Sequence, residues 1–135
     1  MEINIILDWP DKKLSPNKRL CWQAKIKPKQ NAFDNAFQAT IKSKSNISRT
    51  DKLSMTIIFF KPDNIRRDID NLLSSLKPSI DGIFKALKCD DSQIKEYKLL
   101  WGDKVKGGAV LISINEFVDT TSYSIDWLLK NPGSG

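Results

Sequence analysis

Two aspartates separated by one apolar residue, Asp68 and Asp70, stand between an apolar run and a long segment with helical periodicity. In an extended backbone, side chains two residues apart lie on the same side, so both carboxylates could hold one ligand. On a helix they would lie about 200° apart, so a shared ligand requires the helix to begin at or after Asp70. Asp70 would then suit the N-cap position, which is its purely structural interpretation.

A second acidic pair, Asp90 and Asp91, lies in a polar loop before a strand-like run. If the strand after Asp91 pairs beside the strand before Asp68, the acids of this loop approach the first pair. Carboxylates about 4 Å apart repel by about 4 kcal/mol per pair at an effective dielectric constant of 20. A hard divalent cation relieves that repulsion, and oxygen ligands select Mg²⁺, Ca²⁺ or Mn²⁺.

Composition narrows the chemistry further. The 135 residues include no histidine, which removes the commonest general base and the commonest transition-metal ligand. The 22 Lys and Arg against 16 Asp and Glu give a formal charge of +6, which suits a polyanionic partner. The first residues have the pattern of neither a signal peptide nor a membrane span, so we expect no membrane association and a cytoplasmic location.

The elements that must position these acids follow from hydrophobic periodicity. The pattern predicts helices over about 29–44 and from Ile69 to about Lys88, the second kinked at Pro78 or restarted there. The strands are predicted over Glu2–Leu7, Leu53–Phe60, Ile94–Asp103 and Ala109–Phe117, with 104–108 as a hairpin turn between the last two.

The resulting order, β-α-β-α-β-β, predicts an α/β (α+β) fold with one mixed β-sheet and helices packed on it. We expect a single domain over residues 1–119. Residues 120–135 form a C-terminal extension, in which Trp127-Leu128-Leu129 is compatible with a short helix and Gly133-Ser134-Gly135 with a flexible end.

Polar and basic residues surround the acids. One ridge of the second helix carries Asp70, Ser74, Lys77 and Asp81, although a solvated face would look the same. Arg66 and Arg67 are placed to hold backbone phosphates. A basic segment with interleaved tryptophans suits DNA strands or unstacked bases, or is a plain solvated loop; it comprises Trp9, Lys12, Lys13, Lys18, Arg19, Trp22, Lys25, Lys27 and Lys29.

Taken together, several short motifs resemble the signature of the RusA family of Holliday junction resolvases. The stretch Arg66-Arg67-Asp68-Ile69-Asp70-Asn71-Leu72 carries most of the resemblance. The other matching pieces are Trp9-Pro10, Leu14-Ser15-Pro16-Asn17, Trp22, Lys77-Pro78, Asp81-Gly82 and Asp90-Asp91-Ser92-Gln93-Ile94. The similarity extends from about Ile5 to Ile114.

The resemblance implies a homodimer that binds branched DNA, namely four-way junctions, and with Mg²⁺ or Mn²⁺ nicks two strands symmetrically. By motif position Asp68, Asp70 and Asp91 take the catalytic, metal-binding roles, and Asp90 is the adjacent acid that could substitute for Asp91. The family lysine usually follows the second aspartate by about one helical turn, where this chain has Ser74. A three-residue insertion would give its catalytic role to Lys77.

DNA contacts are expected from Arg66, Arg67, Lys18, Arg19, Lys25 and Lys27. One alternative is a non-catalytic nucleic-acid-binding module of the same fold, and another is a metal enzyme acting on nucleotides. Clustered acids would repel DNA in a module that only binds it, and no Gly-rich phosphate loop is present in the sequence. An endonuclease is therefore the leading interpretation.

Overall fold

A computed structural model describes residues 2–118, 123–130 and 133 of the chain. These residues fold around one four-stranded mixed sheet. The strands are β1 (Glu2–Leu7), β2 (Leu53–Phe60), β3 (Ile94–Trp101) and β4 (Ala109–Glu116), in the order β1-β4-β2-β3. β4 is antiparallel to both its neighbours, whereas β2 and β3 are parallel. The predicted α/β (α+β) class, with a mixed sheet and helices packed on it, is confirmed.

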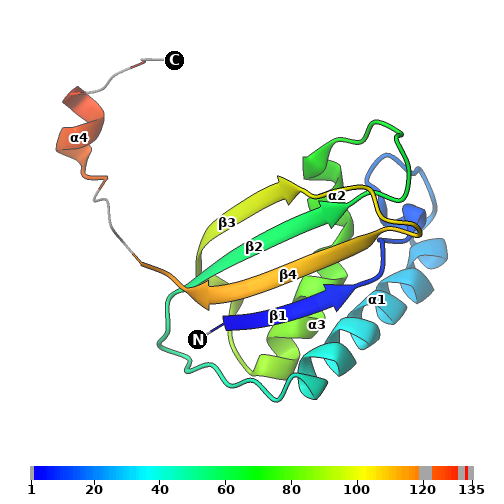
Figure 1. Ribbon diagram of the computed structural model, residues 1–135, viewed down its shortest axis with the longest axis horizontal. Coiled ribbons are helices and arrows are strands. Elements are labelled where there is room, and N and C mark those ends of the chain that lie inside the picture. The colour runs from blue at the N-terminus through cyan, green and yellow to red at the C-terminus, as the bar shows by residue number, and fades with distance from the viewer. Residues whose placement is uncertain (1, 119–122, 131–132, 134–135) are drawn as a thin grey trace.

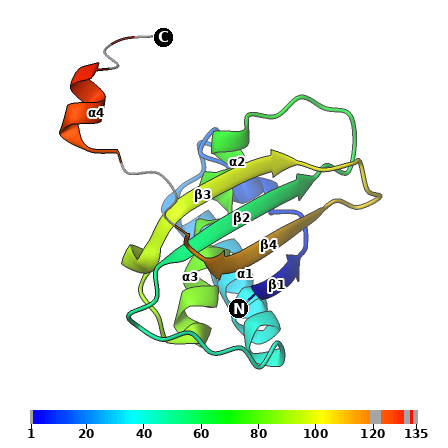
Figure 2. The same ribbon diagram turned by 60° about the vertical axis from the view of Figure 1, so that its left-hand side comes forward.

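Three helices lie behind the sheet in Figure 1 and on the same side of it in Figure 2. They are α1 (Trp22–Lys42), α2 (Ile69–Ser75) and α3 (Lys77–Leu87), and two short 3₁₀ turns are η1 (Lys12–Leu14) and η2 (Asp91–Gln93). Alternate residues of β1, β2 and β4 point toward these helices and are buried, because a half-covered sheet buries one side chain in two. This core includes Ile3, Ile5, Leu7, Met55, Ile57, Phe59, Val110, Ile112, Ile114, Ile80, Ile83 and Phe84.

The break in the second helical segment was predicted and lies beside the expected proline. Leu76 separates α2 from α3. α3 begins at Lys77, one residue before the predicted restart at Pro78, so Pro78 lies in its first turn. A proline fits the first turn because the backbone N–H that it lacks would have no partner within the helix. The two helices run back antiparallel to β2, as the crossover between parallel strands requires.

The first helix begins seven residues earlier than predicted, at Trp22 rather than Lys29, and contains Pro28. Pro28 lies within its early turns, and a proline normally ends or kinks a helix, so the sequence favours a start after it. Of the predicted DNA contacts before β2, Lys25 and Lys27 are therefore helical residues, whereas Lys18 and Arg19 belong to a loop.

The predicted β3–β4 hairpin is wrong. β2 lies between these two strands, and residues 102–108 cross its end. The connection is fixed there because Gly102 N–H donates to the Phe59 carbonyl at 2.9 Å and Val105 N–H donates to the Lys61 carbonyl at 2.9 Å. A Cβ at Gly102 would collide with the Phe60 ring. β4 and β2 are the two inner strands, and the inward side chains of both are completely buried.

The C-terminal extension contains α4 (Ile125–Lys130), over the stretch in which a short helix was expected. Figures 1 and 2 show it clear of the sheet and of the other helices. The expected domain boundary at 119/120 and the last two residues of the expected flexible end lie outside the described residues. Within the described part of the chain, every helix is too short or too polar to cross a membrane.

Candidate active site

The Asp68–Asp70 pair lies where the chain turns from the β2 end into α2. Asp68 has extended backbone angles (φ −85°, ψ 129°) and is the N-cap, and Asp70 is in the first helical turn. A ligand shared by both aspartates was expected to require a helix that begins at or after Asp70. The helix begins at Ile69, one residue earlier, and Asp70 is not the N-cap. The Asp68 side chain nevertheless makes no capping hydrogen bond. Its exposed carboxylate lies 4.0 Å from Nη2 of Arg66.

Asp91 lies toward the other end of the same strands. Because β2 and β3 are parallel, the start of β3 lies beside the start of β2, with Leu53 opposite Ile94. Asp68 follows the far end of β2, and eight strand residues span about 23 Å. The expectation that strand pairing brings Asp91 to Asp68 is therefore wrong. In the part of the chain that the structure describes, no three His, Cys, Asp or Glu side chains are arranged to hold a metal ion.

Lys77 connects Asp91 to the helices. Its Nζ lies 3.2 Å from Oδ1 of Asp81 and 3.6 Å from Oδ2 of Asp91. Partial burial lowers the pKa of Lys77, but the hydrogen bond to Asp81 and the charges of Asp81 and Asp91 outweigh it and the pKa is raised. Lys77 thus stays a cation at neutral pH. Asp81 was not predicted as a site residue, although its position four residues after Lys77 could have indicated this pair.

The remaining residues of the Asp90–Gln93 motif fix the loop. The Asp90 carboxylate accepts the Ser92 N–H at 3.2 Å, and the Gln93 side-chain oxygen accepts the Asp90 N–H at 3.0 Å. The Ser92 backbone N–H is the largest of the hydrogen bonds that hold the pKa of Asp90 below its usual range. Gln93 also donates to the carbonyls of Ser48 and Asp51, at 2.9 and 3.0 Å. Asp90 is thus engaged as a cap, which leaves Asp91 facing Lys77.

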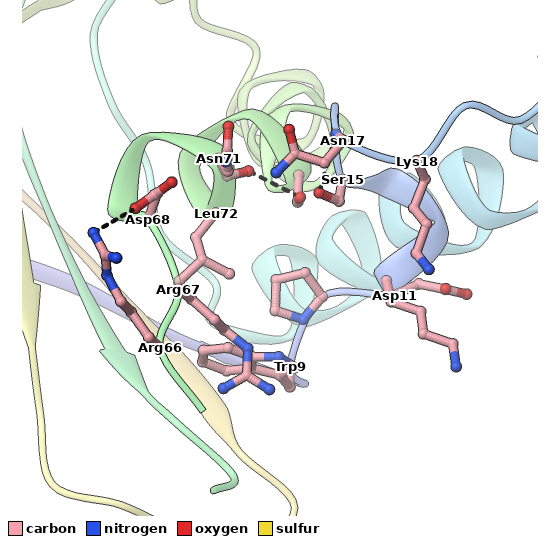
Figure 3. A pocket seen from close by; sticks show the side chains of 13 residues that line it. Trp9, Asp11, Ser15, Asn17, Lys18, Arg66, Arg67, Asp68, Asn71 and Leu72 are labelled. Carbon is pink, nitrogen blue, oxygen red and sulfur yellow. Dashed lines mark hydrogen bonds and ion pairs between the residues drawn. The ribbon is translucent and has the colours of Figure 1, made fainter. Parts of the chain in front are cut away.

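A cleft of about 610 Å³ opens between the loop after β1 and the start of α2 (Figure 3). Its basic lining residues are Lys12, Lys18, Arg66 and Arg67, and its polar ones include Asn17, Asp68 and Asn71. A neighbouring groove of about 640 Å³ is lined by Lys25, Lys29, Ser74, Lys77 and Asp81, among others. Three of the six predicted DNA contacts therefore line the cleft and Lys25 lines the groove, whereas Arg19 and Lys27 are exposed outside both.

The two arginines of this cleft have different surroundings. Arg67 donates to both carboxylate oxygens of Asp63, at 2.6 and 3.0 Å, and its guanidinium carbon lies 5.3 Å from the Trp9 ring centroid. Figure 3 shows it lying over that ring, which also packs edge-on against Phe59. Trp9 is thus part of the cleft wall, and its stacking on bases stays a prediction. The Arg66 side chain is 94% exposed and can reach a ligand.

Comparison with known proteins places these features in a family. No family model matches the chain. An uncharacterized protein of Xylella fastidiosa (strain Temecula1) is 32% identical over 122 residues, which cover 88% of this chain and 80% of that protein. The crossover junction endodeoxyribonuclease rusA of Enterobacteria phage HK97 is 30% identical over 116 residues, 85% of this chain and 95% of the phage protein. The chain belongs to the RusA family. The resemblance carried by the motif at 66–72 is thereby supported over most of the chain.

In this RusA-family chain the Arg67–Asp63 ion pair makes the stability of the fold depend on pH in the acid range. The hydrogen bond from Arg67, followed by the Ile65 backbone N–H, lowers the pKa of Asp63 to about 2 from 3.8. A lowered carboxyl pKa stabilises the fold above the unfolded value, and that contribution is lost as pH falls from about 4 to 2. We expect the melting temperature of the wild type to fall more steeply over this interval than that of Asp63→Asn. Asp34→Asn, an exposed change on α1, should keep the wild-type slope, and equal slopes for all three would contradict the prediction.

Proposed function

We propose that this RusA-family chain is a divalent-metal-dependent endonuclease that resolves four-way DNA junctions by paired symmetric nicks, acting as a homodimer. The observation that carries the proposal is the cleft in which the Asp68 carboxylate, which makes no capping hydrogen bond, lies among four cationic side chains. Cations attract the phosphate backbone, and an acid among them would weaken binding unless it served chemistry. The printed name of the phage HK97 relative supports the same class of activity.

The proposed metal ligands are Asp68 and Asp70, whose oxygen donors suit Mg²⁺ or Mn²⁺. Asp91 lies apart from this pair and contacts Lys77. Asp68 and Asp70 are exposed at the start of α2, with the Asp68 carboxylate not used as a cap, so both fit this role chemically. When bound, the ion would polarise the scissile phosphate and lower the pKa of a bound water. Asp90 is engaged as the η2 cap, so we place it outside the ligand set.

Lys77 is proposed to supply positive charge to the phosphate as negative charge grows on its oxygens. Asp81 and Asp91 hold its ammonium group at the edge of the groove and keep it protonated. Arg66 and Lys18 would contact backbone phosphates in the cleft, and Lys25 would do so in the groove. Two symmetric nicks require two such sites, which a twofold-symmetric pair of chains supplies.

A non-catalytic DNA-binding module of the same fold is the second candidate. The observation in its favour is that no three-acid group capable of holding a metal ion lies within the described residues. The two functions are distinguished by incubating the protein with a labelled four-way junction or a linear duplex, in Mg²⁺ or in EDTA. We expect nicks in the junction with Mg²⁺ alone. Tight junction binding without cleavage in Mg²⁺ or Mn²⁺ would assign the module.

The two arginines give a matched test of the DNA surface. We expect Arg66→Ala to weaken junction binding and to lower the salt dependence of the association constant by about one unit of slope, because one phosphate contact is lost. Its melting temperature should stay at the wild-type value. Arg67→Ala should lower the melting temperature, since Asp63 and Trp9 both lose their partner. Binding titrations at several salt concentrations measure the first effect, and an unchanged slope for Arg66→Ala would contradict it.

A further inference from the structure

The groove beside the cleft continues along the two longest helices. α1 and α3 lie side by side (Figures 1 and 2), and they approach so closely at Gly82 that a Cβ there would collide with the Phe33 carbonyl. A second cavity, of about 870 Å³, adjoins the groove of about 640 Å³, and Phe33 and Asp81 line both of them. The two cavities therefore form one continuous depression, which we call the extended groove.

The extended groove adjoins the cleft that contains the proposed metal ligands. On the loop after β1, Ser15 lines the cleft and its neighbour Pro16 lines the groove. On α2, Ser75 lines the cleft and its neighbour Ser74 lines the groove. A DNA strand that leaves the cleft can therefore enter the extended groove directly.

Cations line both parts of the extended groove. Lys25 and Lys29 belong to its first part, and Arg49 and Lys88 belong to its second part. None of these four side chains forms an ion pair with another residue of the described chain. Their charges are therefore available to an anionic ligand.

The carboxylates of the extended groove, by contrast, are engaged. Asp81 and Asp91 both contact the ammonium group of Lys77, at 3.2 and 3.6 Å. The Asp90 carboxylate accepts the Ser92 N–H at 3.2 Å. The acids of the groove thus have partners within the protein, and the groove favours a ligand with several negative charges.

Two aromatic side chains of α1 lie along the extended groove. The rings of Phe33 and Phe37 are half-buried and nearly parallel, with centroids 6.4 Å apart and an interplanar angle of 11°. Phe33 lines both parts of the groove, and Phe37 lines the second part. Aromatic side chains among cations suit single-stranded nucleic acid, because a base without a partner strand can stack on a ring while its phosphate contacts a cation. In a duplex the neighbouring base pairs cover those faces, so the groove fits an unpaired strand.

We propose that the extended groove holds an unpaired DNA strand, so that the protein acts best on branched DNA with a single-stranded segment beside the branch point. This substrate class rests on the proposed function and makes it more specific. From Lys25 to Phe37, α1 rises about 18 Å, the length of about five stacked nucleotides. A fully paired junction would leave the far part of the groove, around Arg49 and Lys88, empty.

The first test is Arg49→Ala/Lys88→Asn, titrated in EDTA with a labelled oligothymidylate of about twelve nucleotides. Asparagine is chosen because Lys88 has a left-handed backbone (φ 56°), which asparagine tolerates. We expect binding at least about tenfold weaker than in the wild type. The salt dependence of the association constant should fall by about 1.4 units of slope, because two contacts to single-strand phosphates are lost.

The matched control is Lys42→Ala/Lys52→Ala, which removes two exposed lysines that line neither part of the groove and should bind the oligonucleotide normally. With Mg²⁺, the wild type should cut a junction that has one single-stranded arm faster than a fully paired junction, and the groove variant should lose this difference. Wild-type oligonucleotide binding by the groove variant, or an equal loss in the control, would overturn the proposal.

A second variant separates stacking from charge. Phe33→Leu/Phe37→Leu keeps apolar side chains on α1 and removes both rings. We expect oligonucleotide binding about tenfold weaker with an unchanged salt slope, because base stacking is lost and no phosphate contact is. Poly-glutamate serves as a polyanion without bases. If it competed for the groove as well as unlabelled oligothymidylate does, the groove would fit an acidic protein segment and the proposal would be overturned.

Cys89 reports occupation of the groove without any change to its lining. Its thiol is half-buried in the second part of the groove, and Cys21→Ser removes the other cysteine of the chain. We expect oligothymidylate to slow the alkylation of Cys89 by a maleimide in proportion to the fraction of protein bound, and an unchanged rate at saturation would overturn the proposal. A protein that passes this test but cuts no junction would support the groove and refute the endonuclease. Cleavage of junctions without oligonucleotide binding would do the reverse.

Discussion

Asp70→Asn should reduce the single-turnover rate of junction cleavage in Mg²⁺ by at least about 10²- to 10³-fold, the scale of losing one preorganised electrostatic contact. Junction binding should be unchanged or tighter, because the change removes a metal ligand and also a negative charge that repels phosphate. Asp70 is exposed in the first turn of α2, and the contact made there by Ser74 is to its backbone carbonyl. The substitution therefore leaves the helix intact.

Asp68→Asn should have an effect of the same size. Asp91→Asn should also slow cleavage, because Asp91 holds the ammonium group of Lys77, and its replacement is compared with a melting curve. Asp34→Asn on α1 is the control for a lost surface carboxylate. Cleavage by Asp70→Asn at nearly the wild-type rate would show that the metal assignment is wrong. Cleavage of the wild type in EDTA would show the same for the whole ligand set.

Lys77→Ala is expected to lower the cleavage rate at least tenfold with little change in junction affinity, whereas Ser74→Ala should have almost no effect. Lys77 places a cation within 3.6 Å of Asp91, at the edge of a groove lined by two further lysines. Ser74 is neutral, and its hydroxyl donates to the Asp70 carbonyl at 3.2 Å. Of the two candidates for the family lysine position, Lys77 thus carries a charge, whereas the Ser74 hydroxyl is engaged in a hydrogen bond within its own helix.

Lys85→Ala is the matched control, because it removes an exposed lysine from the same helix, α3. Single-turnover rates at saturating enzyme separate the chemical step from binding. If Ser74→Ala were slow and Lys77→Ala normal, the sequence would contain no insertion, and the Lys77–Asp81 pair would be an ordinary surface ion pair.

Local patterns predicted the elements well, and long-range pairings poorly. The alternation at Ile3, Ile5 and Leu7 identifies a half-buried strand without any knowledge of its neighbours, and Pro78 locates the helix break within one residue. The β3–β4 hairpin failed because a turn-like sequence at 104–108 does not reveal that β2 lies between the strands.

The same limit affected the candidate site. Residue types at 66–71 indicated acids and cations together, and Asp68 and Arg66 do lie side by side. The position of Asp91 depended on the direction of a strand pairing, which sequence alone leaves open, and the parallel direction sends it to the opposite end of β2. The position of Trp9 under Arg67 depended on Asp63, whose role is visible only once these three groups are in contact.

The order of strands in the sheet also determines when the protein can fold. Among the strands that the structure describes, β1 pairs only with β4, and Ile3 must find Ile114, 111 residues further along the chain. During synthesis β1 therefore leaves the ribosome before its partner exists, and it remains unpaired until β4 (Ala109–Glu116) has been made. β4 enters between β1 and β2, so the middle of the sheet is the last part to form. Pairings this distant in sequence make folding slow and give a truncated chain no stable intermediate sheet in which β1 could pair.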